Sequence, residues 1–416
     1  MSTIVEGKIR VLDLSMGWAG PLLGQMLAEM GAEVVKVEDT QFFDWWRGSL
    51  SMGPPEMQPI ERASTFNTAN RGKLGVTLDL NNPRGIEIVK RLVTTADILV
   101  ENYSPGIMKR FGLDWEVLRP INPRLIMISM PSFGYGGPET NARGYGNTIE
   151  AMAGVTGLTR YHDAEQPYTL SNALGDPVSG LTGTFGVLAA LHERERTGKG
   201  QWIELAQVEG AIQLVAGPIL EYQLTGAVPR PQGNRNREFA PHGIYGCAGE
   251  RNWLAVAAAT DDQWRALTGA LGLPHLAGDA RFSEVARRKE NEDALDAELR
   301  SALAALSIED AMSRLRAAGV YAAPVNSAAA VIGDPQISDR GYFVAIDRAV
   351  VGTHLYPGAV ARFPETPLNA GDPAPLLGEH NGDVFRRLLG MSEAEIEELE
   401  AAGVIGTRPR QYSKAS

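Results

Sequence analysis

The sequence is poor in the residues that build disulfides and metal sites. It holds a single cysteine, Cys247, and six histidines among 416 residues. One cysteine cannot form a disulfide within the chain, and the histidines show none of the spacings typical of metal ligands. The sequence therefore predicts no intrachain disulfide and no metal site.

Positive charge and long apolar runs are also lacking. The formal net charge is −11 and the sequence pI is about 5.2. The first ten residues, MSTIVEGKIR, contain no apolar core of a signal peptide, and no run of about 18 apolar residues occurs. Nucleic acid and membranes are therefore excluded as expected partners, and we expect a cytoplasmic protein. A local basic pocket for one anionic ligand remains compatible with this charge.

The first third of the chain alternates short apolar runs with helical patterns. Residues 9–14 and 33–38 resemble buried strands, and a helix is expected from Pro21 to about Met30. The same alternation continues, with expected strands at 76–80, 97–102 and 125–130 and a helix at 83–95. Repeated β-α-β units predict an α/β fold with a Rossmann-like parallel sheet.

The rest of the chain is too long to belong to the same core. A long helix at 177–196 and a strand at 201–206 precede a loop at 226–243 that is rich in Gly, Pro, Asn and Arg. Residues 244–325 are expected to form a smaller α+β domain. Composition is loop-rich after about residue 330, an acidic helix is expected at 392–402, and the tail 407–416 is expected to be disordered.

The turn GWAGPLLG, residues 17–24, lies between the first expected strand and helix. Glu38 ends the next strand, which is the position of the ribose-binding acid in dinucleotide sites. However, Ala19 replaces a required glycine and Pro21 follows Gly20, so the G-x-G-x-x-G pattern is absent. A tight turn with close helix packing explains the motif better than NAD or FAD binding.

Eight motifs follow one another along the chain. They are VLDLSMGWAGPLLGQMLAEMGAEVVKVE (11–38), NRGK (70–73), ADILVENYSPGIMKRFGLD (96–114), NPRLIMIS (122–129), FGYGGP (133–138), LGDPVSG (174–180), RTGKGQ (196–201) and APLLGEHN (374–381). Each motif alone is weak. Together, in this order and with this spacing, they resemble class III coenzyme A transferases, the family of formyl-CoA and carnitine CoA transferases, and the resemblance covers the chain from about residue 7 to 405.

This resemblance implies a large Rossmann-like domain built from both chain ends and a smaller α+β domain between them. The expected divisions are 1–225, 226–330 and 331–416, and family members form interlocked dimers. The implied activity moves CoA from an acyl-CoA to a free carboxylic acid. CoA is then a substrate, no cofactor is tightly bound, and the protein partner is a second copy or a related subunit.

Asp176 in LGDPVSG matches the catalytic aspartate of the family. Its carboxylate would attack the thioester, giving an aspartyl anhydride and then an aspartyl-CoA thioester. Taken locally, an Asp before a Pro at a helix start is a common N-cap. A helix N-terminus also favours an anion, so the position suits either role. The ordered motifs favour the nucleophile.

The resemblance also implies a CoA site and the residues that line it. Phosphates call for Arg, Lys and backbone N–H groups, although each such cation alone is more typical of a solvated surface. Trp18 and Ala19 are expected to flank the thioester. The residues expected to line the CoA site are Arg71, Lys73, Asn102, Tyr103, Arg110, Arg143 and Tyr145.

Trp18 departs from the family, in which a smaller polar residue, often Gln, is common. With the aromatic residues Phe42, Phe43, Trp45 and Trp46 nearby, it suggests a bulky or aromatic acyl group. These aromatic residues are also typical of a core. The glycine-rich lid of the family's oxalate-related members has no equivalent here, and the loop 232–243 stands in its place. Its Arg235 and Arg237 could meet a second carboxylate of the substrate or remain solvated.

Two alternatives remain open. Acyl-CoA racemases of the same superfamily carry a Gly-His-Asp motif as a proton shuttle, where this chain has Tyr145 and Gly146. The absence of that histidine argues against racemisation. The second alternative is one subunit of a heteromeric CoA transferase; non-catalytic subunits tend to lose the nucleophile, and Asp176 is present.

Overall fold

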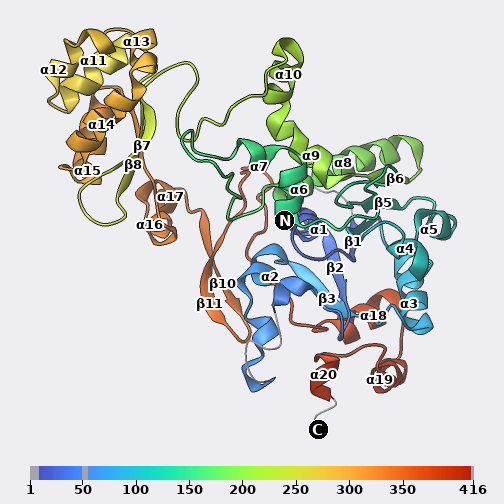
Figure 1. Ribbon diagram of the computed structural model, residues 1–416. Coiled ribbons are helices and arrows are strands. Elements are labelled where there is room, and N and C mark those ends of the chain that lie inside the picture. Colours follow the sequence, from blue (N-terminus) through green and yellow to red (C-terminus); the bar gives the residue numbers. More distant parts are fainter. Residues whose placement is uncertain (1–8, 49–54, 414–416) are drawn as a thin grey trace. The chain divides into compact units, whose positions relative to one another are not determined.

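The computed structural model describes residues 9–48 and 55–413 (Figure 1), which form two compact units. The first unit holds both chain ends and consists of Met1–Val155, Thr169–Leu224 and Arg340–Ser416. The second consists of Thr156–Tyr168 and Thr225–Asp339. The segment 156–168 was expected in the large domain, but its contacts place it in the second unit, where Tyr161 packs closely against Gly233.

A six-stranded parallel sheet forms the centre of the first unit in the described part of the chain. Its strand order is β3-β2-β1-β4-β5-β6, the order of a Rossmann sheet. The central strand β1 pairs with β2 on one side and with β4 on the other, with Leu12 opposite Val35 and Leu99. The strands are β1 (Arg10–Asp13), β2 (Glu33–Glu38), β3 (Lys73–Thr77), β4 (Ile98–Glu101), β5 (Ile126–Ser129) and β6 (Gln201–Glu204).

Helices cover both faces of this sheet, because successive strand residues point to opposite sides. One layer, with α3 and α18, packs on Leu12, Val35, Leu99 and Met127. The other layer, with α1 and α8, packs on Val11, Val34, Ile98 and Ile126. These four helices are α1 (Ala19–Glu29), α3 (Pro83–Val93), α8 (Gly175–Thr197) and α18 (Asn381–Leu389).

The remaining helices of the first unit are short. They are η1 (Trp45–Arg47), η3 (Pro55–Met57), η4 (Pro59–Glu61), α2 (Ser64–Ala69), α4 (Ile107–Phe111), α5 (Trp115–Ile121), α6 (Gly146–Met152), α7 (Val155–Leu158, which reaches into the second unit), α9 (Gln207–Ile212), η5 (Gln213–Val215), α10 (Ala216–Thr225), α19 (Glu393–Ala401) and α20 (Arg410–Ser413). Among residues 9–48 and 55–413, no helix combines the length and the apolar character needed to cross a membrane.

The C-terminal part contains more structure than the sequence predicted. A hairpin of β10 (Phe343–Arg348) and β11 (Gly352–Pro357) lies where loops were expected. The expectation of a disordered tail is wrong for residues 410–413, which form α20. The Arg410 guanidinium holds this turn by an ion pair with Asp79, at 2.9 Å.

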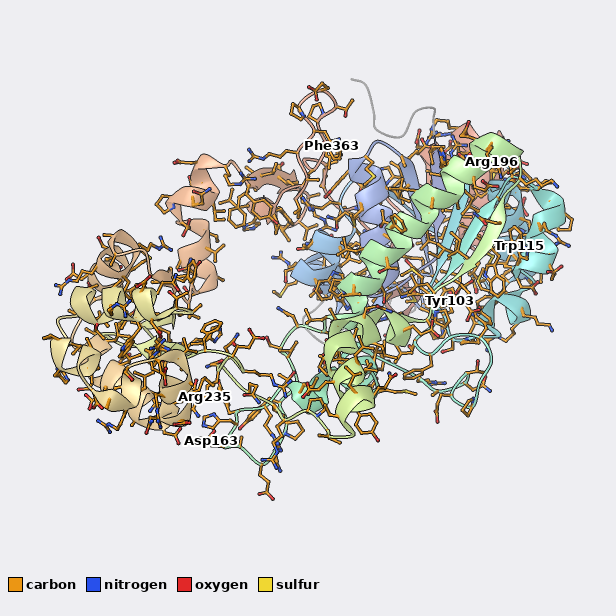
Figure 2. The ribbon with its side chains drawn as sticks, turned by 90° about the horizontal axis from the view of Figure 1, so that it is seen from above. Tyr103, Trp115, Asp163, Arg196, Arg235 and Phe363 are labelled. Carbon is orange, nitrogen blue, oxygen red and sulfur yellow. The ribbon has the colours of Figure 1, made fainter. Side chains whose placement is uncertain are left out.

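The second unit has an antiparallel sheet in the order β7-β8-β9, packed on helices around Trp264 and Phe282. Arg235, labelled in Figure 2, is only 15% exposed and binds Asp293 and Asp296 within this unit. These ion pairs occupy the guanidinium that was considered for a substrate carboxylate. The elements are β7 (His242–Gly246), β8 (Trp253–Ala257), β9 (Tyr321–Pro324), α11 (Asp261–Ala270), α12 (Pro274–Ala277), η6 (Ala280–Phe282), α13 (Val285–Glu290), α14 (Glu292–Leu303), α15 (Ile308–Ala317), α16 (Ala328–Ile332) and α17 (Pro335–Asp339).

Candidate active site

The strand order creates a crevice beyond the carboxyl ends of β1 and β4. The chain leaves these neighbouring strands toward opposite sides of the sheet, and ligands of open α/β folds bind at such a point. Asn102, directly after β4, joins the two loops. Its side-chain amide accepts from the Met16 N–H and donates to the Met16 carbonyl, both at 2.8 Å. This double hydrogen bond fixes the edge of the crevice.

A cavity of about 210 Å³ opens at this crevice. It brings together Asp176, Asn102, Tyr103, Arg143 and Tyr145, five of the residues that the sequence singled out. Trp45, which belongs to the aromatic cluster named from the sequence, also lines it. Sequence reasoning did not assign the remaining lining residues, although the ends of β1 and β4 could have indicated the first three. They are Met16, Ser104, Pro105, Ser132, Ala142, Gly144, Gly146, Ile149 and Gln207.

Asp176 is not the N-cap of its helix. Helix α8 begins one residue earlier, at Gly175, and Leu174 occupies the cap position. The Asp176 carboxylate instead lies near the backbone N–H of Ala19, at the start of α1, and this N–H favours its charged form. Gly180 makes this approach possible, because a Cβ there would lie 2.9 Å from the Ala19 carbonyl oxygen. The local interpretation as a cap is therefore wrong, and the carboxylate is available to the cavity.

The environment of Asp176 disfavours its charged form. Burial is the main cause, the Ala19 N–H opposes it, and the nearby Glu150 carboxylate adds to it, which together raise the pKa of Asp176 to about 6. An aspartate with this pKa is still mostly ionised at pH 7. It is also more basic than an ordinary aspartate, which suits a nucleophile.

Gly146 leaves space for the Asp176 carboxylate. A Cβ at position 146 would lie 2.5 Å from Asp176 Oδ2 and 2.1 Å from the Ala173 Cβ. Any other residue there would force the turn before α8, or the carboxylate itself, to move. The Asp176 carboxylate lies between the start of α6 and the start of α8, and only a glycine at position 146 leaves room for it.

A second cavity, of about 380 Å³, lies beside the first. Tyr103, labelled in Figure 2, lines both cavities and so connects them. Arg110 lines the second cavity together with the apolar side chains of Leu78, Leu80 and Ile107. The pair of cavities offers one cation, Arg110, beside an apolar wall and another, Arg143, in the cavity that contains Asp176.

Arg71 and Lys73, which were expected to bind phosphate, lie outside both cavities. Lys73 is buried and donates to Asp13, to Asn70 and to the Pro21 carbonyl, each at 2.8 Å, so all three ammonium hydrogens are used. Burial lowers the pKa of Lys73 to about 8 against the opposing effect of Asp13. Arg71 is buried too and binds Glu29 and the Ala370 carbonyl. Both cations are bound to other groups of the fold and line neither cavity.

The aromatic residues form a chain that reaches the first cavity. Trp18 packs on Trp46 with ring centroids 5.3 Å apart, and Trp46 packs on Trp45 at 6.0 Å. Trp45 meets Tyr145 edge to face at 5.8 Å, and both line the cavity that contains Asp176. The backbone N–H of Ala19 lies near Asp176. Trp18 packs on Trp46 and does not itself line the cavity. Trp45 therefore stands where the sequence suggested Trp18.

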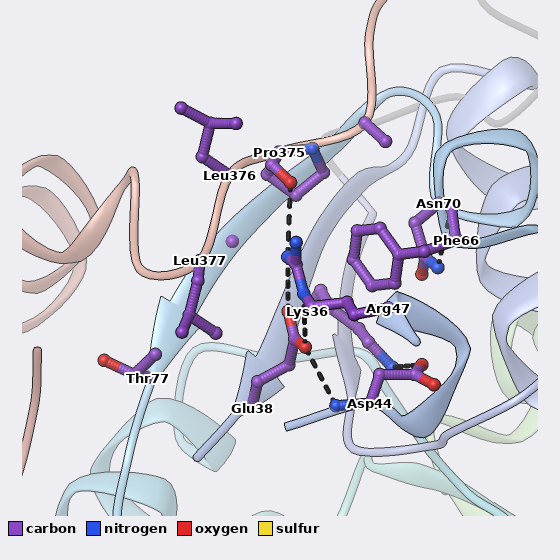
Figure 3. Close-up of polar contacts among 12 residues, drawn as sticks. Lys36, Glu38, Asp44, Arg47, Phe66, Asn70, Thr77, Pro375, Leu376 and Leu377 are labelled. Carbon is purple, nitrogen blue, oxygen red and sulfur yellow. Dashed lines mark hydrogen bonds and ion pairs between the residues drawn. The ribbon is translucent and has the colours of Figure 1, made fainter. Parts of the chain in front are cut away.

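Asp44, directly before Trp45, belongs to a buried ion pair with Lys36; both residues are labelled in Figure 3. The Lys36 ammonium pairs with Asp44 at 3.1 Å and also donates to the Ser15 carbonyl. Asp44 in turn accepts from the Gly17 N–H and from the Trp46 N–H, at 2.9 and 3.0 Å. The loops after β1 and β2 are thereby joined directly behind Trp45.

Comparisons with known proteins identify the family of this chain. The model of CoA-transferase family III matches residues 7–381. A succinyl-CoA--D-citramalate CoA-transferase of Chloroflexus aurantiacus is 34% identical over 405 residues, covering 95% of this chain and 97% of that protein. From the same organism, the β subunit of a succinyl-CoA--L-malate CoA-transferase is 32% identical over 406 residues, covering 97% and 99%.

A solved structure gives the same result for the fold. The crystal structure of a CaiB/BaiF family protein from Brucella suis superimposes with a TM-score of 0.85 at 33% identity, covering 93% of this chain and all of that one. The matches extend over nearly the whole chain and confirm the resemblance found in the sequence motifs. The chain therefore belongs to CoA-transferase family III.

Proposed function

We propose that this enzyme moves CoA from an acyl-CoA donor to a carboxylic acid through covalent intermediates on Asp176. An Asp176 oxygen attacks the thioester carbonyl, the C–S bond breaks, and CoA leaves as a thiolate. The thiolate attacks the aspartyl carbonyl of the resulting anhydride and releases the donor acid, which leaves an aspartyl-CoA thioester. The acceptor carboxylate then attacks this thioester, and the returning thiolate takes the acceptor acyl group. No net proton is consumed.

The observation that carries this proposal is the position of Asp176. Asp176 lines the crevice of a Rossmann-type sheet together with Tyr145 and Arg143, with one backbone N–H nearby and partial shielding from water. Shielding matters because water would hydrolyse the anhydride. Gly146 supports the transferase over the racemase, because the acid that racemases carry at this position would collide with Asp176.

The test compares Asp176→Asn with wild type in an assay for newly formed acyl-CoA. Loss of the nucleophile should lower the turnover by at least about a thousandfold. Hydroxylamine added during turnover should modify Asp176 in the wild-type enzyme only. Asp163→Asn changes an exposed carboxylate of the second unit and serves as the matched control. A fully active Asp176→Asn enzyme would overturn the mechanism.

We propose further that the donor is succinyl-CoA and that the acceptor is a bulky or aromatic acid. The donor is supported by the names of the two Chloroflexus relatives, which both use succinyl-CoA. The acceptor is supported by Trp45 and Tyr145, which present flat apolar surface beside Asp176. A panel of aromatic acids, citramalate and malate tests this, with Trp45→Leu as the variant. Exclusive use of small hydroxy diacids by wild type would refute the acceptor.

The proposed assembly is an interlocked homodimer in a cytoplasmic enzyme. It is supported by large apolar side chains that α8 and α10 leave exposed, including Phe185 at 74% and Leu224 at 86%. The alternative, pairing with a related subunit, is supported by the similarity to the β subunit of a malate CoA-transferase. The mass of the purified complex and the activity of this chain expressed alone distinguish the two.

A further inference from the structure

Glu150, on α6, is a buried acid with an unusual set of contacts. Glu150 is only 1% exposed to solvent. One oxygen, Oε1, accepts the backbone N–H of Leu174, the residue directly before α8. The other, Oε2, is buried and has no hydrogen-bond partner within the described chain. Burying a carboxylate without full compensation costs free energy, so the fold tolerates Glu150 against its own stability.

The contact to Leu174 links Glu150 to the nucleophile candidate two residues later. Leu174 caps α8, and Asp176 stands in the first turn of that helix. By fixing the Leu174 N–H, Glu150 fixes the direction in which the first turn leaves the loop. Its charge also contributes to the raised pKa of Asp176, after burial as the larger cause.

We propose that Glu150 is a positioning residue for the nucleophile: it holds the turn from Leu174 to Asp176, and its negative charge strengthens Asp176 as an attacking group. The inference rests on the proposed role of Asp176. A neighbouring anion makes a carboxylate more basic, and more basic carboxylates attack a carbonyl faster as long as they remain ionised.

No other described group around Asp176 supplies a negative charge that makes its carboxylate more basic. The remaining titratable residues of the cavity are Tyr103, Arg143 and Tyr145. Helix α1 presents the Ala19 N–H, which favours the charged form, and α9 contributes the neutral Gln207. Among the described charged groups, Glu150 is the one whose charge opposes ionisation of Asp176.

Two substitutions separate orientation from charge. Glu150→Gln keeps an oxygen that can accept the Leu174 N–H but removes the charge. We expect the acid limb of kcat/KM to move to lower pH and the plateau rate to fall a few-fold. Glu150→Ala removes both, so kcat should fall by about 100-fold. KM for the acyl-CoA should stay within a factor of about two, because the other cavity residues are unchanged.

A direct titration keeps this test independent of the proposed function. Carbon NMR of the aspartate carboxyl groups reports the pKa of Asp176, with its signal assigned by loss in Asp176→Asn. We expect a lower value in Glu150→Gln than in wild type, whether or not CoA transfer is observed. Unchanged titration of Asp176 in Glu150→Gln, with wild-type melting temperature, overturns the inference; absent CoA transfer with a shifted titration overturns only the proposed function.

Discussion

Asp176 and Asp44 are two aspartates near the same end of the sheet, and their surroundings give them different roles. Asp44 is fully buried, paired with Lys36 and bound by two backbone N–H groups. Asp176 has one N–H donor and a neighbouring acid. The first carboxylate is held by an ion pair and two N–H donors, whereas the second opens to the cavity beside Tyr145. This contrast is invisible in the sequence, where Asp176 lies within a family motif and Asp44 lies shortly after one.

The raised pKa of Asp176 predicts that kcat/KM falls on the acid side of the pH profile. Attack requires the carboxylate, and the pKa of Asp176 is about 6. We expect kcat/KM for the acyl-CoA to rise with pH, to reach half its maximum near pH 6 and to level off above pH 7. Initial rates between pH 5 and 8 at constant ionic strength measure this. A flat profile over the same range would contradict it.

The raised pKa of Asp176 also predicts that its ionised carboxylate lowers the free energy of unfolding. The pKa of Asp176 is raised in the folded protein, so folding favours the protonated form, and stability from this group is lost as pH rises from about 4 to 6. Asp176→Asn mimics the neutral form. It should be more stable than wild type by up to about 3 kcal/mol above pH 6 and nearly equal below pH 4. Urea unfolding at pH 4, 5, 6 and 8 tests this, with Asp163→Asn as the control.

At the scale of elements, apolar patterns predicted the main sheet well. The strands β1, β2, β4 and β5 lie within the predicted runs, because strands buried on both faces are continuously apolar. The third strand was placed at 76–80 but spans Lys73–Thr77. Its first residue is a lysine, and a sequence does not show that Asp13, 60 positions away, neutralises it. For the same reason, Lys73 and Arg71 were expected to bind phosphate: the sequence does not show that Asp13 and Glu29 bind them in the fold.

The loops after β1 and β2 depend on the Lys36–Asp44 pair. Lys36→Met leaves Asp44 buried without its cation, which should lower the free energy of unfolding by about 3–5 kcal/mol. The double variant Lys36→Met/Asp44→Asn removes both charges and should recover part of that loss. Arg84→Met, which breaks an exposed pair with Glu398, should cost less than about 1 kcal/mol. Denaturant unfolding compares the three; equal losses for Lys36→Met and Arg84→Met would refute the role of the pair.

At the scale of the whole molecule, the two chain ends form one structure. Glu61, in the N-terminal part, binds Arg47 and also Arg348 of the returning chain, at 2.8 and 2.9 Å. The backbone N–H of Leu377 adds a third bond to the same carboxylate. The family resemblance implied a domain built from both ends. Composition did not reveal α20, because Arg410 binds Asp79, which is far away in sequence. The hairpin β10–β11 was also not predicted, although its two strands pair locally.

The proposed interlocked dimer makes a prediction about dissociation. If two closed chains are threaded through each other, they cannot separate on dilution without unfolding part of one chain. We therefore expect the dimer mass to persist at nanomolar concentration in mass photometry, and subunits labelled with two dyes should not exchange over days in native buffer. Phe185→Asp places a charge on the exposed apolar face of α8 and should lower the melting temperature of a dimer, but should not produce folded monomers. A folded monomer of either protein at nanomolar concentration would show that the subunits are not interlocked.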